Sequence, residues 1–449
     1  MEQNLTTGSV FRTIVRFSLP YLLSYFLQTL YGMADLFIIG QYEGVAATTA
    51  VSIGSQVMHM LTVMLVGLAM GTTVSIAQAV GGGNRARASA ATGNSITLFT
   101  ALSLALTAGL LLLVKPITAL MSTPSEAVSG ARTYLSICFL GIPFITAYNI
   151  LSSIFRGLGD SRGPMIFVAI ACAANIALDY LFMGALHLGP AGAALGTTIA
   201  QALSVCIALL TIRKKRLMRV QRPDLRPQPS VMGQILRVGL PVMLQDGLIQ
   251  VSFVTITIIA NHRGLTDAAA VGIVEKIMSF LFLVPSAMLS SVSALGAQNL
   301  GAGKPERAVA TLRYAILLSS SLCLALVALV QLTAEQLVGA FTPDTLVALS
   351  GGQYLRGYVF DCLFGSVQFS FSGYFCARGR SSLSFLHNIL SIALIRIPGA
   401  YFASRCFPHT LLPMGLASAA GSLFSVLICL VLYAVLRRKD RTAVEKATG

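Results

Sequence analysis

Long apolar runs alternate with short polar segments along the whole chain. Each run has about 20 residues or more, the length that a helix needs to cross the hydrocarbon core of a bilayer. The runs are too long for β-barrel strands, and glycines, prolines and charges separate them. The pattern predicts an all-α polytopic membrane protein with twelve transmembrane helices. The predicted spans are residues 12–40, 46–79, 90–113, 128–156, 163–185, 190–213, 232–261, 267–298, 307–331, 347–376, 382–404 and 411–436.

Composition and charge agree with this class. The chain is 55% hydrophobic and 10% charged, with a mean hydropathy of +0.78, whereas soluble domains carry about 25% charged residues. A net charge of +15 would suit nucleic acid, but the basic residues lie in short loops, as in membrane proteins. The loops on one side, with both termini, hold 22 Lys and Arg, and the opposite loops hold five. We therefore expect a multi-pass protein of the inner (plasma) membrane with cytoplasmic termini and no nucleic-acid partner.

The sequence repeats itself at a period of about 220 residues. Residues 78–88 read QAVGGGNRARA and residues 298–308 read QNLGAGKPERA, and Pro20 returns as Pro241. Each copy holds six spans, so both copies have the same orientation in the membrane. Such repeats are related by an axis along the membrane normal, and we expect binding between them.

This repeat predicts the domain organisation. We expect an N-terminal six-helix bundle at residues 1–213 and a C-terminal six-helix bundle with a basic tail at residues 232–449. Prolines and like charges in residues 214–231 predict an extended cytoplasmic linker. We expect a monomer surrounded by membrane lipids.

The first span carries a stripe of polar residues. Tyr21, Ser24, Gln28, Tyr31 and Asp35 follow one another at steps of three or four, so they share one helical face. A charge at the bilayer centre costs at least about 2.5–3.5 kcal/mol, so this face lines a protein interior or a watery cavity. The alternative is a stripe that only joins helices, but an intramembrane carboxylate marks a functional site by default.

Further polar residues in the first half complete a candidate ion site. Asn175 and Asp179 are four apart on span 5, and Thr197 and Gln201 are four apart on span 6. With Asp35 they supply two carboxylates and neutral oxygens. Such a set suits a hard cation or a shared proton.

The second half holds its own acids at positions where the first half is neutral. Glu275 lies on span 8, and its alternative role is a salt bridge with Lys276 or Arg396. The sequence leaves the roles of Asp246 and Arg396 open. The polar stripe on span 10 includes Tyr358, Asp361 and Gln368.

The remaining motifs do not indicate an enzyme. No Ser/His/Asp or HExxH constellation is evident, and we expect no cofactor beyond a coupling ion. The basic segments RGLGD (156–160) and GAGKPER (301–307) are interpreted as turns with cytoplasmic anchoring charges, because the second lacks phosphate-loop spacing.

Several motifs together resemble the multidrug and toxic compound extrusion (MATE) family. They are the first span with Pro20 and Asp35, QAVGGGNRARA, FRGLGDSR, and Asn175-x-x-x-Asp179 followed by PAGAALGT. The resemblance covers residues 10–437. It implies a V-shaped pair of six-helix bundles that exports bulky cationic or amphipathic compounds, driven by Na⁺ or H⁺.

The resemblance also implies residue roles. In its DinF-type branch the first bundle couples the cation, and the matching residues, which are also the tentative Na⁺ ligands, are Asp35, Asn175, Asp179 and Thr197. Pro20 matches the proline at which the first helix bends. Glu275 and Asp361 resemble the second-bundle acids of the NorM-type branch. The residues expected to line the substrate cavity are Gln28, Tyr31, Gln201, Glu275, Tyr358, Asp361 and Gln368.

Two functions therefore stay open. The first is a cation-coupled drug antiporter, with coupling assigned mainly to Asp35 and Asp179. The second is a flippase for a lipid-linked or anionic amphiphile, which needs a basic cavity. The predicted intramembrane charges are five acids and two bases, and this excess of acid favours cationic cargo. The physiological substrate and the choice between Na⁺ and H⁺ are not encoded in readable motifs.

Overall fold

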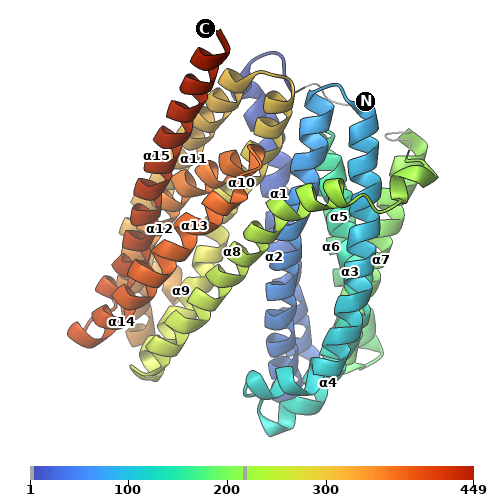
Figure 1. Cartoon of the computed structure of the whole chain (residues 1–449). Coiled ribbons are helices and arrows are strands. Elements are labelled where there is room, and N and C mark those ends of the chain that lie inside the picture. Colours follow the sequence, from blue (N-terminus) through green and yellow to red (C-terminus); the bar gives the residue numbers. More distant parts are fainter. Residues whose placement is uncertain (1–4, 216–219, 449) are drawn as a thin grey trace. The chain divides into compact units, whose positions relative to one another are not determined.

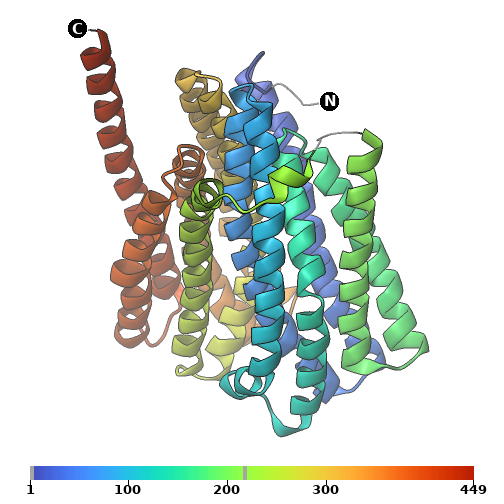
Figure 2. The same cartoon turned by 45° about the vertical axis from the view of Figure 1, so that its right-hand side comes forward.

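The computed structural model describes residues 5–215 and 220–448. Within these residues the chain is helical and forms no strand, which confirms the all-α fold class. Figures 1 and 2 show long helices joined by short turns. In chain order the elements are α1 (Val10–Tyr42), α2 (Val45–Gly81), α3 (Arg85–Leu120), α4 (Ser125–Leu140), α5 (Ile142–Gly157), α6 (Arg162–Asp179), the π-helix η1 (Tyr180–Ala185), α7 (Gly189–Lys215), the 3₁₀-helix η2 (Arg222–Leu225), α8 (Pro229–Asn261), α9 (Leu265–Leu281), α10 (Leu283–Gly301), α11 (Pro305–Gly339), α12 (Thr345–Ala377), α13 (Ser381–Ser391), the π-helix η3 (Ile392–Arg396), α14 (Ile397–Cys406) and α15 (Leu412–Thr448).

The helices correspond to the predicted spans. Among the described residues, ten helical segments are long and apolar enough to cross a membrane. The fourth predicted span is the bent pair α4 and α5, which meet at Gly141 at an angle of 48°. The tenth is α12, which is 33 residues long but carries the polar stripe that lowers its hydropathy.

The helices pack into two compact units. The first unit contains Met1–Met243 and Ala297–Arg307, and the second contains Leu244–Gly296 and Ala308–Gly449. The start of α8 and the end of α10 thus pack with the first unit, although the sequence repeat assigns them to the second half.

Two apolar clusters frame the interior of the first unit. One contains Ile38, Ile39 and Met183, and the other contains Phe155 and Phe167 with Leu27 packed against it. Because Leu27 and Ile38 lie on the same helix, the polar residues between them on α1 sit between the clusters. This arrangement places the candidate ion site between the two apolar clusters.

Pro20 does not break the first helix. The α-helix runs through it from Val10 to Tyr42, although Pro20 has no N–H to donate to the preceding turn. The hydroxyl of Ser24 donates to the carbonyl of Pro20 at 2.8 Å. The helix is therefore continuous through Pro20 in this conformation, and bending there during transport stays a prediction.

The linker is not extended over the part that the structure describes. It contains the turn η2, which is bound to α3. The side-chain amide of Asn94 donates to the carbonyl of Asp224 at 3.2 Å and accepts from the backbone N–H of Gln228 at 2.7 Å. Thr97 donates to the carbonyl of Leu225 at 2.8 Å. These bonds satisfy the carbonyls of Asp224 and Leu225 and the N–H of Gln228. An extended strap was predicted because the sequence does not reveal these partners on α3. Residues 216–219 of the predicted linker lie outside the described residues.

In the second unit, α12 packs most closely against α15. Gly357 and Gly415 face each other so closely that a Cβ at either position would meet backbone atoms of the opposite helix. This close crossing keeps α12, with its polar stripe, in the centre of the unit.

Candidate ion and substrate sites

The first site is assembled from three helices of the first unit. Asp35 comes from α1, Asn175 and Asp179 from the last two turns of α6, and Thr197 from the third turn of α7. Asp35, Asn175 and Asp179 are 3%, 2% and 0% exposed. The structure thus brings together the four residues predicted to bind the coupling ion.

The carboxylates of this site lack an internal cation. Asp35 and Asp179 interact directly with each other, and Thr197 Oγ1 donates to Asp35 Oδ2 at 3.2 Å. Asp35 Oδ1 and both carboxylate oxygens of Asp179 are buried without a hydrogen-bond partner, as are both amide atoms of Asn175. Two adjacent buried carboxylates cannot both stay charged unless a proton or a cation lies between them. Among the described side chains, none compensates the negative charge of this pair.

Two local features position Asp179, and neither was predicted from the sequence. The π-helix η1 begins directly after Asp179, and π-turns are frequent at functional sites. Gly196 on α7 faces the Asp179 carboxylate so closely that a Cβ there would collide with Oδ1. Its position directly before Thr197 in PAGAALGT was the signal available in the sequence.

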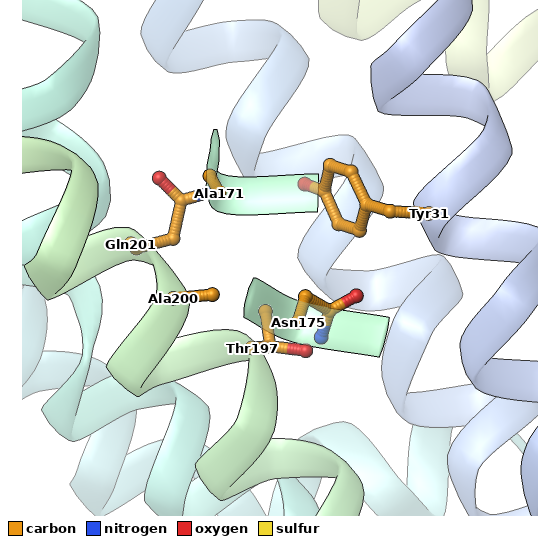
Figure 3. Close-up of a pocket in the computed structure, with 6 residues that line it drawn as sticks. All are labelled: Tyr31, Ala171, Asn175, Thr197, Ala200 and Gln201. Carbon is orange, nitrogen blue, oxygen red and sulfur yellow. The ribbon is translucent and has the colours of Figure 1, made fainter. Parts of the chain in front are cut away.

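A small cavity of about 10 Å³ adjoins the site. It holds about one water molecule. Figure 3 shows Tyr31 reaching into it from α1, opposite Gln201 on α7 and above Asn175 and Thr197. The predicted cavity residues Tyr31 and Gln201 therefore lie at the ion site. Gln28, one turn earlier on α1, lies beside Tyr148 of α5.

The described residues contain no group of three or more His, Cys, Asp or Glu side chains that would hold a metal ion. The site offers two carboxylates and neutral oxygens only. This donor set fits a hard monovalent cation or a proton better than a softer metal.

In the second unit, Asp361 is neutralised by a cation of the chain itself. Arg396, the last residue of η3, approaches Asp361 Oδ2 with one guanidinium nitrogen at 3.1 Å. The same nitrogen donates to the hydroxyl of Tyr358 at 2.8 Å. Asp361 is 0% and Arg396 7% exposed, so this is a buried ion pair. From the sequence, Arg396 could neutralise either Glu275 or Asp361, and the structure pairs it with Asp361.

The other predicted residues of this unit have neutral partners. Glu275 accepts from Thr257 Oγ1 at 3.1 and 3.2 Å, and among the described residues it forms no ion pair with Lys276 or Arg396. The alternative of a salt bridge to Lys276 or Arg396 is therefore wrong, and the partner of Glu275 is the neutral Thr257 on α8. The side-chain amide of Gln368 donates to Ser422 at 3.0 Å.

Arg156 is not the loop anchor that the sequence predicted. Helix α5 continues to Gly157 and carries Arg156 in its last turn. The side chain is only 7% exposed, and its guanidinium lies 4.7 Å from the ring centre of Tyr21. The first unit therefore contains a buried cation as well as buried acids.

Comparison with known proteins agrees with the geometry. The MatE family model matches residues 20–181 and again residues 241–402. The chain is similar to the probable multidrug resistance protein YpnP of Bacillus subtilis, with 28% identity over 395 residues that cover 88% of each chain. It is 25% identical over 439 residues to the multidrug export protein MepA of Staphylococcus aureus, covering 97% of this chain and 96% of MepA. Its fold matches an outward-facing MATE-family multidrug resistance transporter with a TM-score of 0.90 and 22% identity, over 97% of this chain and 98% of that one.

Proposed function

The chain belongs to the MatE family of membrane transporters, and we propose that it is a secondary active antiporter exporting cationic or amphipathic toxic compounds in exchange for Na⁺ or H⁺. The names of the relatives, a probable multidrug resistance protein and a multidrug export protein, support drug export. The observation that carries the proposal is the facing pair of buried carboxylates, Asp35 and Asp179, which lacks a cation of its own.

The coupling ion enters this site from outside. It neutralises Asp35 and Asp179, and Thr197 and Asn175 add neutral oxygens or a hydrogen bond. A protonated carboxylate or a bound Na⁺ removes the repulsion between the two acids, so α1 and α6 are stable in closer association when the ion is present. Because the ion stabilises one arrangement more than the other, its gradient shifts the equilibrium between them.

Each unit offers its own polar and aromatic groups to cargo. Tyr31 and Gln201 offer contacts beside the ion site, so cargo and ion binding are coupled there. In the second unit Glu275 attracts positive charge, and a cargo cation competes with Arg396 for Asp361. Tyr358 and Gln368 provide further hydrogen-bonding groups.

Transport by the purified protein in proteoliposomes tests the proposal. Vesicles are loaded with a fluorescent lipophilic cation, and either a Na⁺ gradient or a pH gradient is imposed alone. One gradient should drive cation movement, and the other should not. Movement of an anionic lipid without response to either gradient would instead establish the flippase alternative.

The proposed orientation places both termini in the cytoplasm. Ser230 lies next to the start of α8 and is exposed. A single cysteine at this position should react with a membrane-impermeant maleimide only after cells are opened. Labelling of intact cells would reverse the orientation.

A further inference from the structure

Three polar groups on one face of α5 are buried in the first unit and form no hydrogen bond of good geometry, although the hydroxyl of Tyr148 lies near Ser152 and Gln28. They are the hydroxyl of Tyr148, the hydroxyl of Ser152 and Nε of Arg156. The three side chains are 4%, 0% and 7% exposed. Their spacing of four residues aligns them along the helix. Buried polar groups in native proteins are nearly always satisfied by protein, water or ligand, so three unsatisfied donors in a row require an explanation.

The surroundings of Arg156 contain no compensating acid. Its electrostatic neighbours are Tyr21, Tyr25 and Tyr148, and within the described part of the chain no carboxylate forms an ion pair with it. A buried charge without a partner is strongly unfavourable. The contact with the Tyr21 ring offsets only part of this, because a cation–π contact contributes about 0.5–2 kcal/mol.

In the second copy of the repeat, side chains at the equivalent positions have hydrogen-bond partners within the protein. The repeat places Gln368, Ser372 and Cys376 opposite Tyr148, Ser152 and Arg156. There Gln368 bonds to Ser422 at 3.0 Å, and Ser372 bonds to His387 at 3.0 Å. The second copy thus has internal partners and no cation at these positions. At these positions of the described chain, Gln368 Oε1 is unpaired in the second copy, whereas the first copy leaves hydroxyl and guanidinium donors unpaired and adds a positive charge.

We propose that Arg156 and Ser152, with Tyr21 packed against the guanidinium and Tyr148 extending the polar face, bind the carboxylate group of a zwitterionic amphiphile. One guanidinium carries one positive charge and matches one carboxylate. The guanidinium fork suits planar carboxylate geometry. This inference rests on the proposed function, since it adds a chemical group to the cargo class: compounds that carry a carboxylate as well as a cation.

Equilibrium binding to the full-length protein in nanodiscs tests the site without any ion gradient. The probes are rhodamine 110, which has a free carboxylate, and rhodamine 123, its methyl ester. Fluorescence polarisation gives the dissociation constant of each. Arg156→Gln should weaken rhodamine 110 binding by about tenfold or more, as expected for a lost charge-assisted hydrogen bond. Rhodamine 123 binding should change less than about twofold.

Three further variants serve as controls for the binding experiment. Arg162→Gln removes a neighbouring but exposed arginine and should alter neither probe. Arg156→Lys keeps the charge and should retain part of the preference for rhodamine 110. Ser152→Ala should weaken rhodamine 110 alone, by a smaller factor, and keeps the test decisive if Arg156→Gln does not fold.

Equal loss of both probes in Arg156→Gln, or no loss of either, would overturn the site and leave the stripe as a place for water. Because binding is measured without transport, selective binding with no ion-driven efflux would reject the antiport proposal and keep this one. Ion-driven efflux without selective binding would do the reverse.

Discussion

The two units bury their carboxylates beside different partners. In the first unit, Asp35 and Asp179 face each other, and three of their four oxygens lack a partner. In the second unit, Asp361 lies 3.1 Å from the guanidinium of Arg396. The same repeat therefore supports a site that needs a cation from solution and a site that carries its own.

This difference assigns different tasks to the two bundles. A pair of uncompensated acids binds or releases a cation as its concentration changes, and such a site couples transport to a gradient. A buried ion pair keeps its net charge over a wide range of conditions. We therefore expect ion dependence to follow the first site and cargo preference to follow the second.

The largest expected effect comes from neutralising the first site. Asp35→Asn and Asp179→Asn each remove the need for a cation between two acids, because an amide is neutral. Ion-driven efflux in proteoliposomes should fall to the level of empty vesicles. The proteins should still fold, since the amide is nearly isosteric with the carboxylate and a buried charge is removed.

The matched variant in the second unit is Asp361→Asn. It leaves Arg396 buried without its acid, so its thermal midpoint is measured together with transport. The variant should change the cargo range or affinity more than the Na⁺ or pH dependence. If Asp361→Asn loses all ion-driven transport while Asp179→Asn keeps its ion dependence, the second bundle is the motor and the comparison is reversed.

The next effect concerns stability in the second unit. Arg396→Gln leaves Asp361 buried without its cation, which should destabilise the protein by about 3–5 kcal/mol. Thermal unfolding in detergent measures this as a lower midpoint. The double variant Asp361→Asn with Arg396→Gln should recover most of the loss, because it leaves no lone charge. Equal midpoints for Arg396→Gln and the unmodified protein would show that Asp361 does not depend on Arg396.

The smallest expected effect tests whether the close contact between Gly196 and Asp179 is needed for ion binding at the first site. A Cβ at Gly196 collides with Asp179 Oδ1, so Gly196→Ala should displace that carboxylate. The ion concentration for half-maximal efflux should rise by several-fold, consistent with about 1–3 kcal/mol of overpacking strain. Gly32→Ala on α1 is the control, because a Cβ there meets no atom within 4 Å. An unchanged ion requirement in Gly196→Ala would mean that Asp179 does not need this position.

The spans were predictable because membrane helices are specified by length and apolarity, which the sequence displays directly. The proximity of Asp35, Asn175, Asp179 and Thr197 could also be predicted. Their spacing placed them on polar helix faces, and the family resemblance implied that these faces meet. The bend at Gly141 could not be predicted, because a straight helix and a bent helix can have the same apolar sequence pattern.

Pairings across helices were harder to predict. Whether Arg396 meets Asp361 depends on the rotation of the helix around its axis, and one extra residue in a π-turn rotates the rest of the helix by about 100°. Arg156 was assigned to a loop because FRGLGD has the composition of a turn, yet α5 continues to Gly157 and buries it. Neither position differs in residue type from an ordinary surface arginine.

The pairing of Arg396 with Asp361 has a consequence for selectivity. A guanidinium attached to the same chain competes at a very high effective concentration with any free cation that reaches Asp361. Charge alone is then not enough to displace it. A small inorganic cation offers only charge, whereas a large aromatic cation adds apolar contact with side chains such as Phe253, whose ring lies 5.1 Å from the Arg396 guanidinium. Under the proposed function, a tethered competitor of this kind would set a minimum affinity that abundant cellular ions do not reach and bulky aromatic cations do.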